Sequence, residues 1–69
     1  MYEIIDNNGT IHSGTEEEME TAFFCMTNSI SEIMEYYELN KKQAIELKNK
    51  YETSWDGDLK FIQVLDIHR

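Results

Sequence analysis

Carboxylates are the most frequent side chains in this sequence that could take part in chemistry. The first forty residues contain nine of them and neither lysine nor arginine. Two carboxylates can act as a general acid and a general base, but only in a cleft that separates their pKa values. A chain of 69 residues is too short to enclose a deep pocket, and no pattern marks one glutamate as buried. We therefore predict a protein that is not an enzyme and has no catalytic residues.

Other reactive or metal-binding side chains are few and widely spaced. His12, Cys25 and His68 do not stand at the spacing of metal ligands. Residues 56–58 (Asp-Gly-Asp) lack the further oxygen ligands of a calcium loop and are typical of a turn. No cation stands near Cys25 in the sequence to activate its thiol. The scattered glycines form no phosphate-binding loop, so we expect neither a metal nor a cofactor.

Charge is distributed very unevenly along the chain. The first forty residues carry a net charge of about −9 and the remainder about +1. Such a one-signed field favours a basic protein partner and disfavours direct binding to nucleic acid or to an anionic membrane. Four lysines on the next predicted helix are expected to pair with the acids of the preceding helix, within the molecule or across a dimer. These lysines are Lys41, Lys42, Lys48 and Lys50.

Length and composition indicate one small domain over residues 1–69. No basic segment followed by an apolar run opens the sequence, so we expect no signal peptide and no membrane span. The single cysteine, Cys25, is consistent with a cytoplasmic protein and cannot form an internal disulfide. Because a core this small gives little stability, we expect good packing, a partner or, most of all, self-association to supplement it.

The N-terminal residues have the pattern of a β-hairpin. Residues 2–6 and 10–13 flank an Asn-Gly pair, Asn8–Gly9, which is expected to supply the positive φ angles of a tight turn. The same pair begins a glycosylation sequon, which we interpret as accidental in a chain without a secretion signal.

A long helix is predicted over residues 16–38. Thr15 and Glu18 have the spacing of a capping box, and apolar residues then recur every three or four positions. Ser29 and Glu32 could cap a second helix, but the unbroken apolar phase favours one helix, kinked at most.

A second helix is predicted over residues 41–54, capped by Asn40 and Gln43, and a final strand over residues 59–67. The strand has apolar residues on both faces, so it needs cover on both sides or an interface on one. The expected fold is α+β, in the order β-β-α-α-β, with a three-stranded sheet and a helical pair packed on one face. Tracing the chain suggests that the last strand runs antiparallel to the second or parallel to the first.

Phe24 is the most informative single residue. On a continuous helix it falls opposite the apolar stripe, among the acidic side chains. One interpretation is an exposed anchor for a partner or a second copy of the chain. The other is a helix buried on two sides, or a kink at Asn28 that turns Phe24 inward. Tyr36 would join a patch with Phe24 only if the helix is kinked or twisted. The predicted partner-binding residues are Phe24, Glu17, Glu20, Glu35 and Glu38.

Together these features favour a non-enzymatic acidic protein that inhibits or regulates a basic partner by occupying its surface. The partner would be a nucleic-acid-binding or defence-related protein, and the acids of residues 16–38 would imitate nucleic-acid phosphates. A merely solvated acidic helix face is the alternative explanation of these acids, and a phage origin is a hypothesis from composition alone. The competing function is a self-associating structural or accessory module that dimerises through the first helix or through the last strand, where Ile62 and Val64 would meet their copies.

Overall fold

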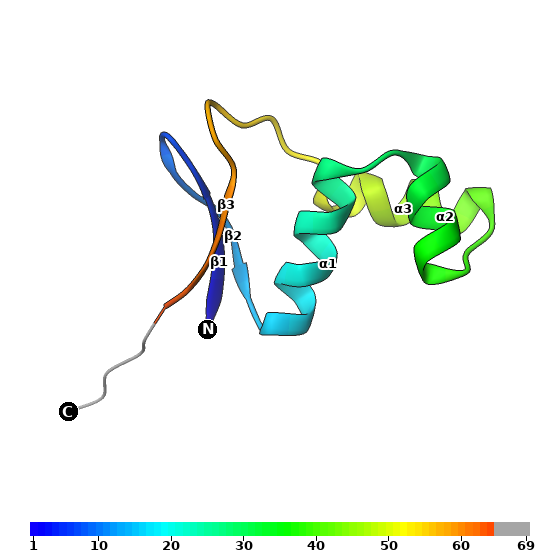
Figure 1. Ribbon diagram of the computed structural model, residues 1–69, viewed down its shortest axis with the longest axis horizontal. Helices are drawn as coiled ribbons and strands as arrows, with labels where there is room; N and C mark the ends of the chain where they lie inside the picture. Colours follow the sequence, from blue (N-terminus) through cyan, green and yellow to red (C-terminus); the bar gives the residue numbers. More distant parts are fainter. Residues whose placement is uncertain (65–69) are drawn as a thin grey trace.

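The computed structural model describes residues 1–64, which form a three-stranded sheet and three helices (Figure 1). In chain order the elements are β1 (Tyr2–Asp6), β2 (Gly9–Gly14), α1 (Glu16–Thr27), α2 (Ile30–Tyr37), α3 (Lys41–Tyr51) and β3 (Lys60–Gln63). The predicted α+β class and three-stranded sheet are confirmed. No helix within residues 1–64 has the length and apolar character needed to cross a membrane.

The hairpin forms where it was predicted, although its turn differs from the expected one. Asp6 pairs with Gly9, so Asn7 and Asn8 make the turn and only Gly9 has a positive φ, of 125°. The Asp6 carboxylate accepts a hydrogen bond from the Asn8 amide at 2.8 Å, which stabilises this turn in place of the expected Asn-Gly geometry. The β1–β2 register shifts between Ile4 and Ile5, which leaves β2 with a bulge.

The strand order is β2-β1-β3, and β3 runs antiparallel to β1. The predicted direction of the last strand, antiparallel to β2 and so parallel to β1, is therefore wrong. The loop before β3 explains the result, because the Asp56 amide donates to the Asp6 carboxylate at 2.9 Å and the Asn7 amide donates to the Asp56 carbonyl at 2.9 Å. These bonds bring the chain back at the turn end of the hairpin. From there β3 can only run away from the turn, and it is therefore antiparallel to β1.

The prediction of one helix over residues 16–38 is wrong, because α1 ends at Thr27 and α2 begins at Ile30. Ser29 is the N-cap of α2 and makes both bonds of a capping box with Glu32. The Asn28 side chain donates to the Phe24 carbonyl at 2.9 Å and so occupies a free carbonyl at the end of α1. The side chains of Asn28 and Ser29 therefore form hydrogen bonds with free backbone groups at the end of α1 and at the start of α2.

The other two predicted caps are confirmed. Thr15 and Glu18 form a capping box at α1, and Asn40 and Gln43 form one at α3. The third helix ends at Tyr51, three residues before its predicted end. At this end of α3, the Tyr51 carbonyl oxygen lies 3.0 Å from Nε2 of His12 in β2, and this contact joins the two elements.

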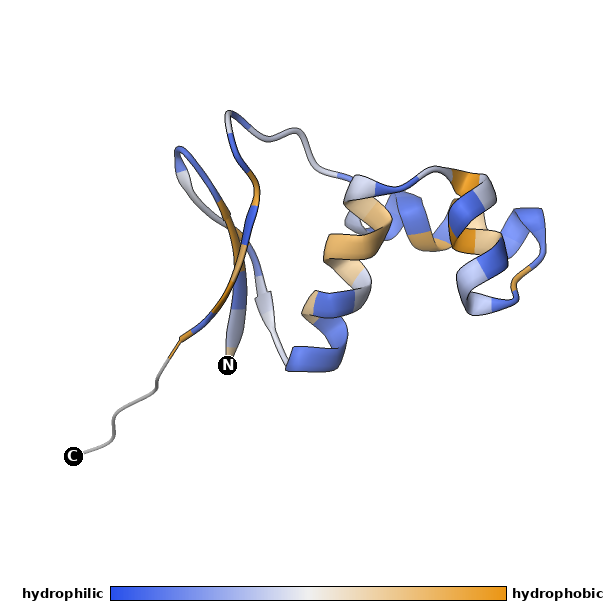
Figure 2. Cartoon of the chain, in the orientation of Figure 1, coloured by the Kyte–Doolittle hydropathy of each residue, from blue (hydrophilic) through white to orange (hydrophobic). Residues whose placement is uncertain are grey.

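The helices do not lie side by side on the sheet. Only α1 packs against all three strands, and α2 and α3 pack together on its other side (Figure 1). One core joins Ile4 to Met19, Ala22 and Met26 between the sheet and α1. A second core joins Cys25 to Ile33 and Ala44 between the three helices. Apolar residues accordingly appear on more than one side of α1 (Figure 2).

The final strand is paired over Lys60–Gln63, and residues 65–67 of its predicted extent lie outside the described residues, as does His68. Phe61 pairs with the buried Ile4 and therefore shares the face of the sheet that α1 covers. Ile62 pairs with Glu3 on the opposite face and is 36% exposed. The last strand is predicted to need cover on both faces or an interface on one. In the structure, α1 covers one of these two faces.

Candidate functional site

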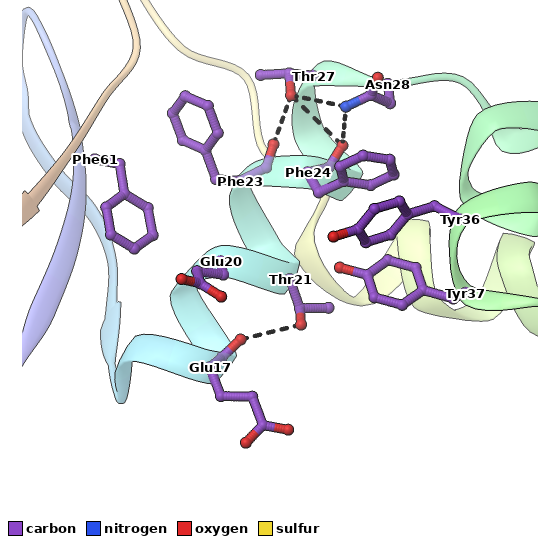
Figure 3. A pocket seen from close by; sticks show the side chains of 10 residues that line it. All are labelled: Glu17, Glu20, Thr21, Phe23, Phe24, Thr27, Asn28, Tyr36, Tyr37 and Phe61. Carbon is purple, nitrogen blue, oxygen red and sulfur yellow. Dashed lines mark hydrogen bonds between the residues drawn. The ribbon is translucent and has the colours of Figure 1, made fainter.

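A groove of about 690 Å³ lies across α1, with β3 on one side and α2 on the other (Figure 3). Ten residues line it, and most of them are acidic, aromatic or hydroxyl-bearing. They are Glu17, Glu20, Thr21, Phe23, Phe24, Thr27, Asn28, Tyr36, Tyr37 and Phe61. The volume falls in the ordinary range of ligand-binding pockets. None of the ten is a lysine or an arginine.

The sheet side of the groove is aromatic. Phe23 of α1 meets Phe61 of β3 edge to face, with ring centroids 6.0 Å apart. Tyr2 of β1 packs against the same Phe61 ring at 5.6 Å. All three rings are only partly buried and join the sheet to α1, and two of them, Phe23 and Phe61, give the groove an aromatic wall.

The opposite wall is a second aromatic cluster, contributed by α1 and α2. The Phe24 and Tyr36 rings are stacked, with centroids 4.5 Å apart and planes 26° from parallel. Tyr37 meets Phe24 edge to face at 5.5 Å and Tyr36 at 4.9 Å. Tyr36 is 67% exposed, so much of its surface is available to a ligand.

Phe24 is not the free anchor that a continuous helix would present. It is half-buried and packs against the core of Cys25, Ile33 and Ala44. The end of α1 at Thr27 causes this, because it allows α2 to turn back and bring Tyr36 and Tyr37 onto the Phe24 ring. Both alternatives to an exposed anchor are therefore present in the structure: α1 is buried on two sides, and the helix breaks at Asn28.

The predicted acidic residues are divided among three places. Glu17 and Glu20 lie in the groove, on the same surface of α1 as Thr21 (Figure 3). Glu35 lines a neighbouring hollow with Glu32 that shares Phe24 and Tyr36 with the groove. Glu38 is exposed at the C-cap of α2, outside the lining of both hollows. Three of the four predicted acidic residues therefore line hollows to which Phe24 and Tyr36 also contribute.

The negative field of α1 affects two neighbouring tyrosines. A hydrogen bond to Glu16 raises the pKa of Tyr2, and the charges of Glu16 and Glu20 raise it further. Burial raises the pKa of Tyr37, and the charge of Glu20 adds to that effect. Both hydroxyls are protonated at neutral pH, and that of Tyr2 donates its hydrogen bond to Glu16.

Hydrogen bonds from Thr15 lower the pKa of Glu18 in α1, and the charge of Lys50 in α3 lowers it further, in line with the predicted pairing of this lysine with an acid of the preceding helix. Lys48 has a different role from the predicted one. The Lys48 ammonium donates to the carbonyls of Cys25 and Asn28 at 2.8 and 2.9 Å. A cation at this position complements the free carbonyls at the C-terminus of α1. Lys48 therefore stabilises a helix end, and the acids of the groove remain uncompensated by it.

The remaining reactive side chains have structural surroundings. Cys25 is fully buried, and burial raises the pKa of its thiol. His12 is half-buried, with Nε2 3.2 Å from the Thr53 hydroxyl in addition to the Tyr51 carbonyl. Within residues 1–64, no three His, Cys, Asp or Glu side chains are grouped closely enough to hold a metal ion.

No protein-family model, curated protein or solved structure matches the chain. The functional inference therefore depends on the groove residues and on the charge of the chain. The sequence pattern does not place Phe23, Tyr37 or Phe61 in the site, and it links Tyr36 to Phe24 only through a kinked or twisted helix. Of these, Tyr36 and Tyr37 were within reach, because the capping spacing of Ser29 and Glu32 predicts the helix break that brings them to Phe24.

Proposed function

We propose that this chain is a non-enzymatic binding protein that inhibits or regulates a basic protein by occupying its surface. The observation that carries the proposal is the groove itself, whose lining combines Glu17 and Glu20 with five aromatic rings and includes no lysine or arginine. Aromatic faces and carboxylates both attract arginine and lysine side chains. A partner with a basic surface would therefore gain contact area and charge pairing at the same place.

The charge distribution supports the same function. The acids of α1 and α2 belong to a stretch of forty residues without lysine or arginine. We propose that they take the place of nucleic-acid phosphates on a nucleic-acid-binding or defence-related protein, as a DNA mimic would, and that the protein acts in the cytoplasm. A phage-encoded inhibitor would have these properties. Direct nucleic-acid or membrane binding is disfavoured by the same charge.

Affinity capture followed by measurement with the purified partner tests this function. Glu17→Gln with Glu20→Gln should weaken binding about tenfold, because two carboxylates facing cations would be lost. Tyr36→Ala should also weaken binding, and it suits this test better than Phe24→Ala because Tyr36 is mostly exposed whereas Phe24 packs in a core. The matched control is Glu46→Gln with Glu52→Gln, which removes the same charge from residues outside the groove lining.

Two results would contradict the proposal. One is that every partner recovered is acidic or neutral. The other is that the two double variants weaken binding equally, which would mean that the groove acids contribute only through the net charge of the protein. Circular dichroism of each variant establishes that the fold is retained before binding is compared.

Self-association is the second candidate function, and one specific observation favours it. Ile62 is 36% exposed on the face of the sheet that α1 does not cover, and Ile5 lies on that face as well. A homodimer that buries this face would supply the cover that the last strand, with apolar residues on both faces, requires. Ile62→Lys should then produce monomers, as measured by sedimentation.

A further inference from the structure

The edge of the sheet beside the groove, formed by β3, bears on how a partner would bind. The strand order places β3 at one edge, and within residues 1–64 no strand pairs with its outer side. An edge strand presents unpaired amides and carbonyls that can accept another strand. The other edge strand, β2, has a bulge, whereas the pairing of β3 with β1 runs through four consecutive residue pairs without a shift. The regular edge is thus the one that adjoins the groove.

We propose that an extended, arginine-bearing segment of the partner protein pairs with this edge of β3 and places an arginine in the groove. The inference rests on the proposed function, since it specifies the chemistry of the basic partner. In an added strand, alternate side chains would point to the same face as Phe61, over α1. The added strand would lie about 4.8 Å from β3, so those side chains would reach the rings of Phe23 and Phe24 and the carboxylate of Glu20.

The lining of the groove favours arginine over lysine. The planar guanidinium stacks on aromatic faces and binds carboxylates through two parallel hydrogen bonds. Tyr36 offers a largely exposed ring, and Glu20 lies on the sheet side of the same groove, whereas the Glu17 side chain extends from the first turn of α1 at one end of the groove (Figure 3). An arginine in the groove would therefore have an aromatic face to stack on and the Glu20 carboxylate to pair with, and Glu17 would add to the negative charge at the groove.

Titration of the ¹⁵N-labelled protein with short capped peptides tests the inference by NMR. The probe alternates valine and arginine. Three matched peptides replace arginine by citrulline, replace arginine by lysine, or carry N-methyl groups on alternate backbone nitrogens. We expect saturable shifts at the amides of β3 and at the groove residues with the arginine peptide. Citrulline and N-methylation should each weaken binding about tenfold, and lysine should weaken it less.

Protein variants locate the contact. Glu17→Gln with Glu20→Gln should weaken binding of the arginine peptide about tenfold, whereas Glu46→Gln with Glu52→Gln should change it by less than about twofold. Equal binding of the N-methylated and unmodified peptides would overturn strand pairing. Failure of the arginine peptide to bind at low salt would overturn the whole inference.

The same measurements separate this inference from the proposed function. If a captured basic partner binds in a manner sensitive to Glu17 and Glu20 but leaves the β3 amides unchanged, the function stands and strand pairing is wrong. If no basic partner binds, the function itself is wrong. Shifts at β3 that depend on protein concentration in the absence of peptide would show a second copy of the chain on this edge and would also overturn the inference.

Discussion

At the scale of single residues, Gly57 illustrates how one position directs the return of the chain to the sheet. It has a φ of 75° in the loop before β3, and a Cβ at this position would overlap the Asn7 side chain in the hairpin turn. Glycine therefore satisfies both the left-handed backbone and the close approach of loop and turn. The sequence pattern indicated a turn at this position but not its contact with the hairpin.

We expect Gly57→Ala to destabilise the protein by about 2–3 kcal/mol, because it adds backbone strain and a steric overlap. Urea denaturation followed by circular dichroism measures this change. Asn7→Ala should recover part of the loss in the Gly57→Ala background, since it removes the overlapping side chain. Strict additivity of the two substitutions would show that Asn7 is not the obstacle.

Asp6 makes the stability dependent on pH. Its carboxylate accepts hydrogen bonds from the amides of Asp56 and Asn8, and these bonds, that of Asp56 most of all, lower its pKa below the ordinary value of 3.8. A carboxyl whose folded pKa is lowered stabilises the fold above its unfolded pKa, and this stabilisation disappears as the pH falls through the folded pKa.

Asp6→Asn should therefore be less stable than the wild type near pH 7, and the difference should shrink as the pH falls to about 2.5. Urea midpoints of both proteins across this range measure the effect. A difference that stays constant with pH would mean that the ionised carboxylate is not the stabilising species.

At the scale of elements, α1 depends on a residue from α3 for its C-terminus. Lys48→Met removes the charge-assisted hydrogen bonds to the carbonyls of Cys25 and Asn28 and keeps most of the side-chain volume. We expect a loss of about 1–2 kcal/mol in the free energy of unfolding. Lys42→Met, at an exposed position in the first turn of α3, should change it by less than about 0.5 kcal/mol. Equal losses of stability from both substitutions would mean that Lys48 contributes only through its charge.

The end of α2 offers a stabilising substitution. Glu38 has a φ of 55°, a left-handed conformation that glycine adopts without strain. Glu38→Gly should therefore raise the free energy of unfolding by about 0.5–1 kcal/mol. Glu35→Gly, the same change in the interior of α2, should lower it by about 1 kcal/mol. A loss at both positions would show that the Glu38 side chain contributes to the fold.

The three capping boxes show which features of the elements were accessible from sequence. Each is a local pattern of two side chains three residues apart, and each forms, at Thr15, Ser29 and Asn40. The helix break was mispredicted because apolar phase was weighted above the Ser29 cap. Apolar phase continues across the break because the residues on both sides still face a core, although not the same core.

At the scale of the whole molecule, salt separates the two candidate functions. A complex held by Glu17 and Glu20 with a basic partner should weaken when the salt concentration rises from about 0.05 M to about 0.5 M. A homodimer formed through Ile62 should persist or tighten over the same range. Light scattering and sedimentation at both concentrations measure the two effects. A partner complex that is insensitive to salt would contradict a charge-based interface.

Local patterns in the sequence are enough to predict the hairpin, the helix caps, the third helix and the concentration of negative charge. These features depend on residues only a few positions apart, so a pattern contains the necessary information. The strand order, the burial of α1 on two sides and the positions of Phe24 and Tyr36 opposite Phe23 and Phe61 in the groove follow only from the folded molecule. Those outcomes depend on contacts between residues far apart in the chain, such as Asp6 with Asp56 and Lys48 with Cys25, which no local spacing reveals.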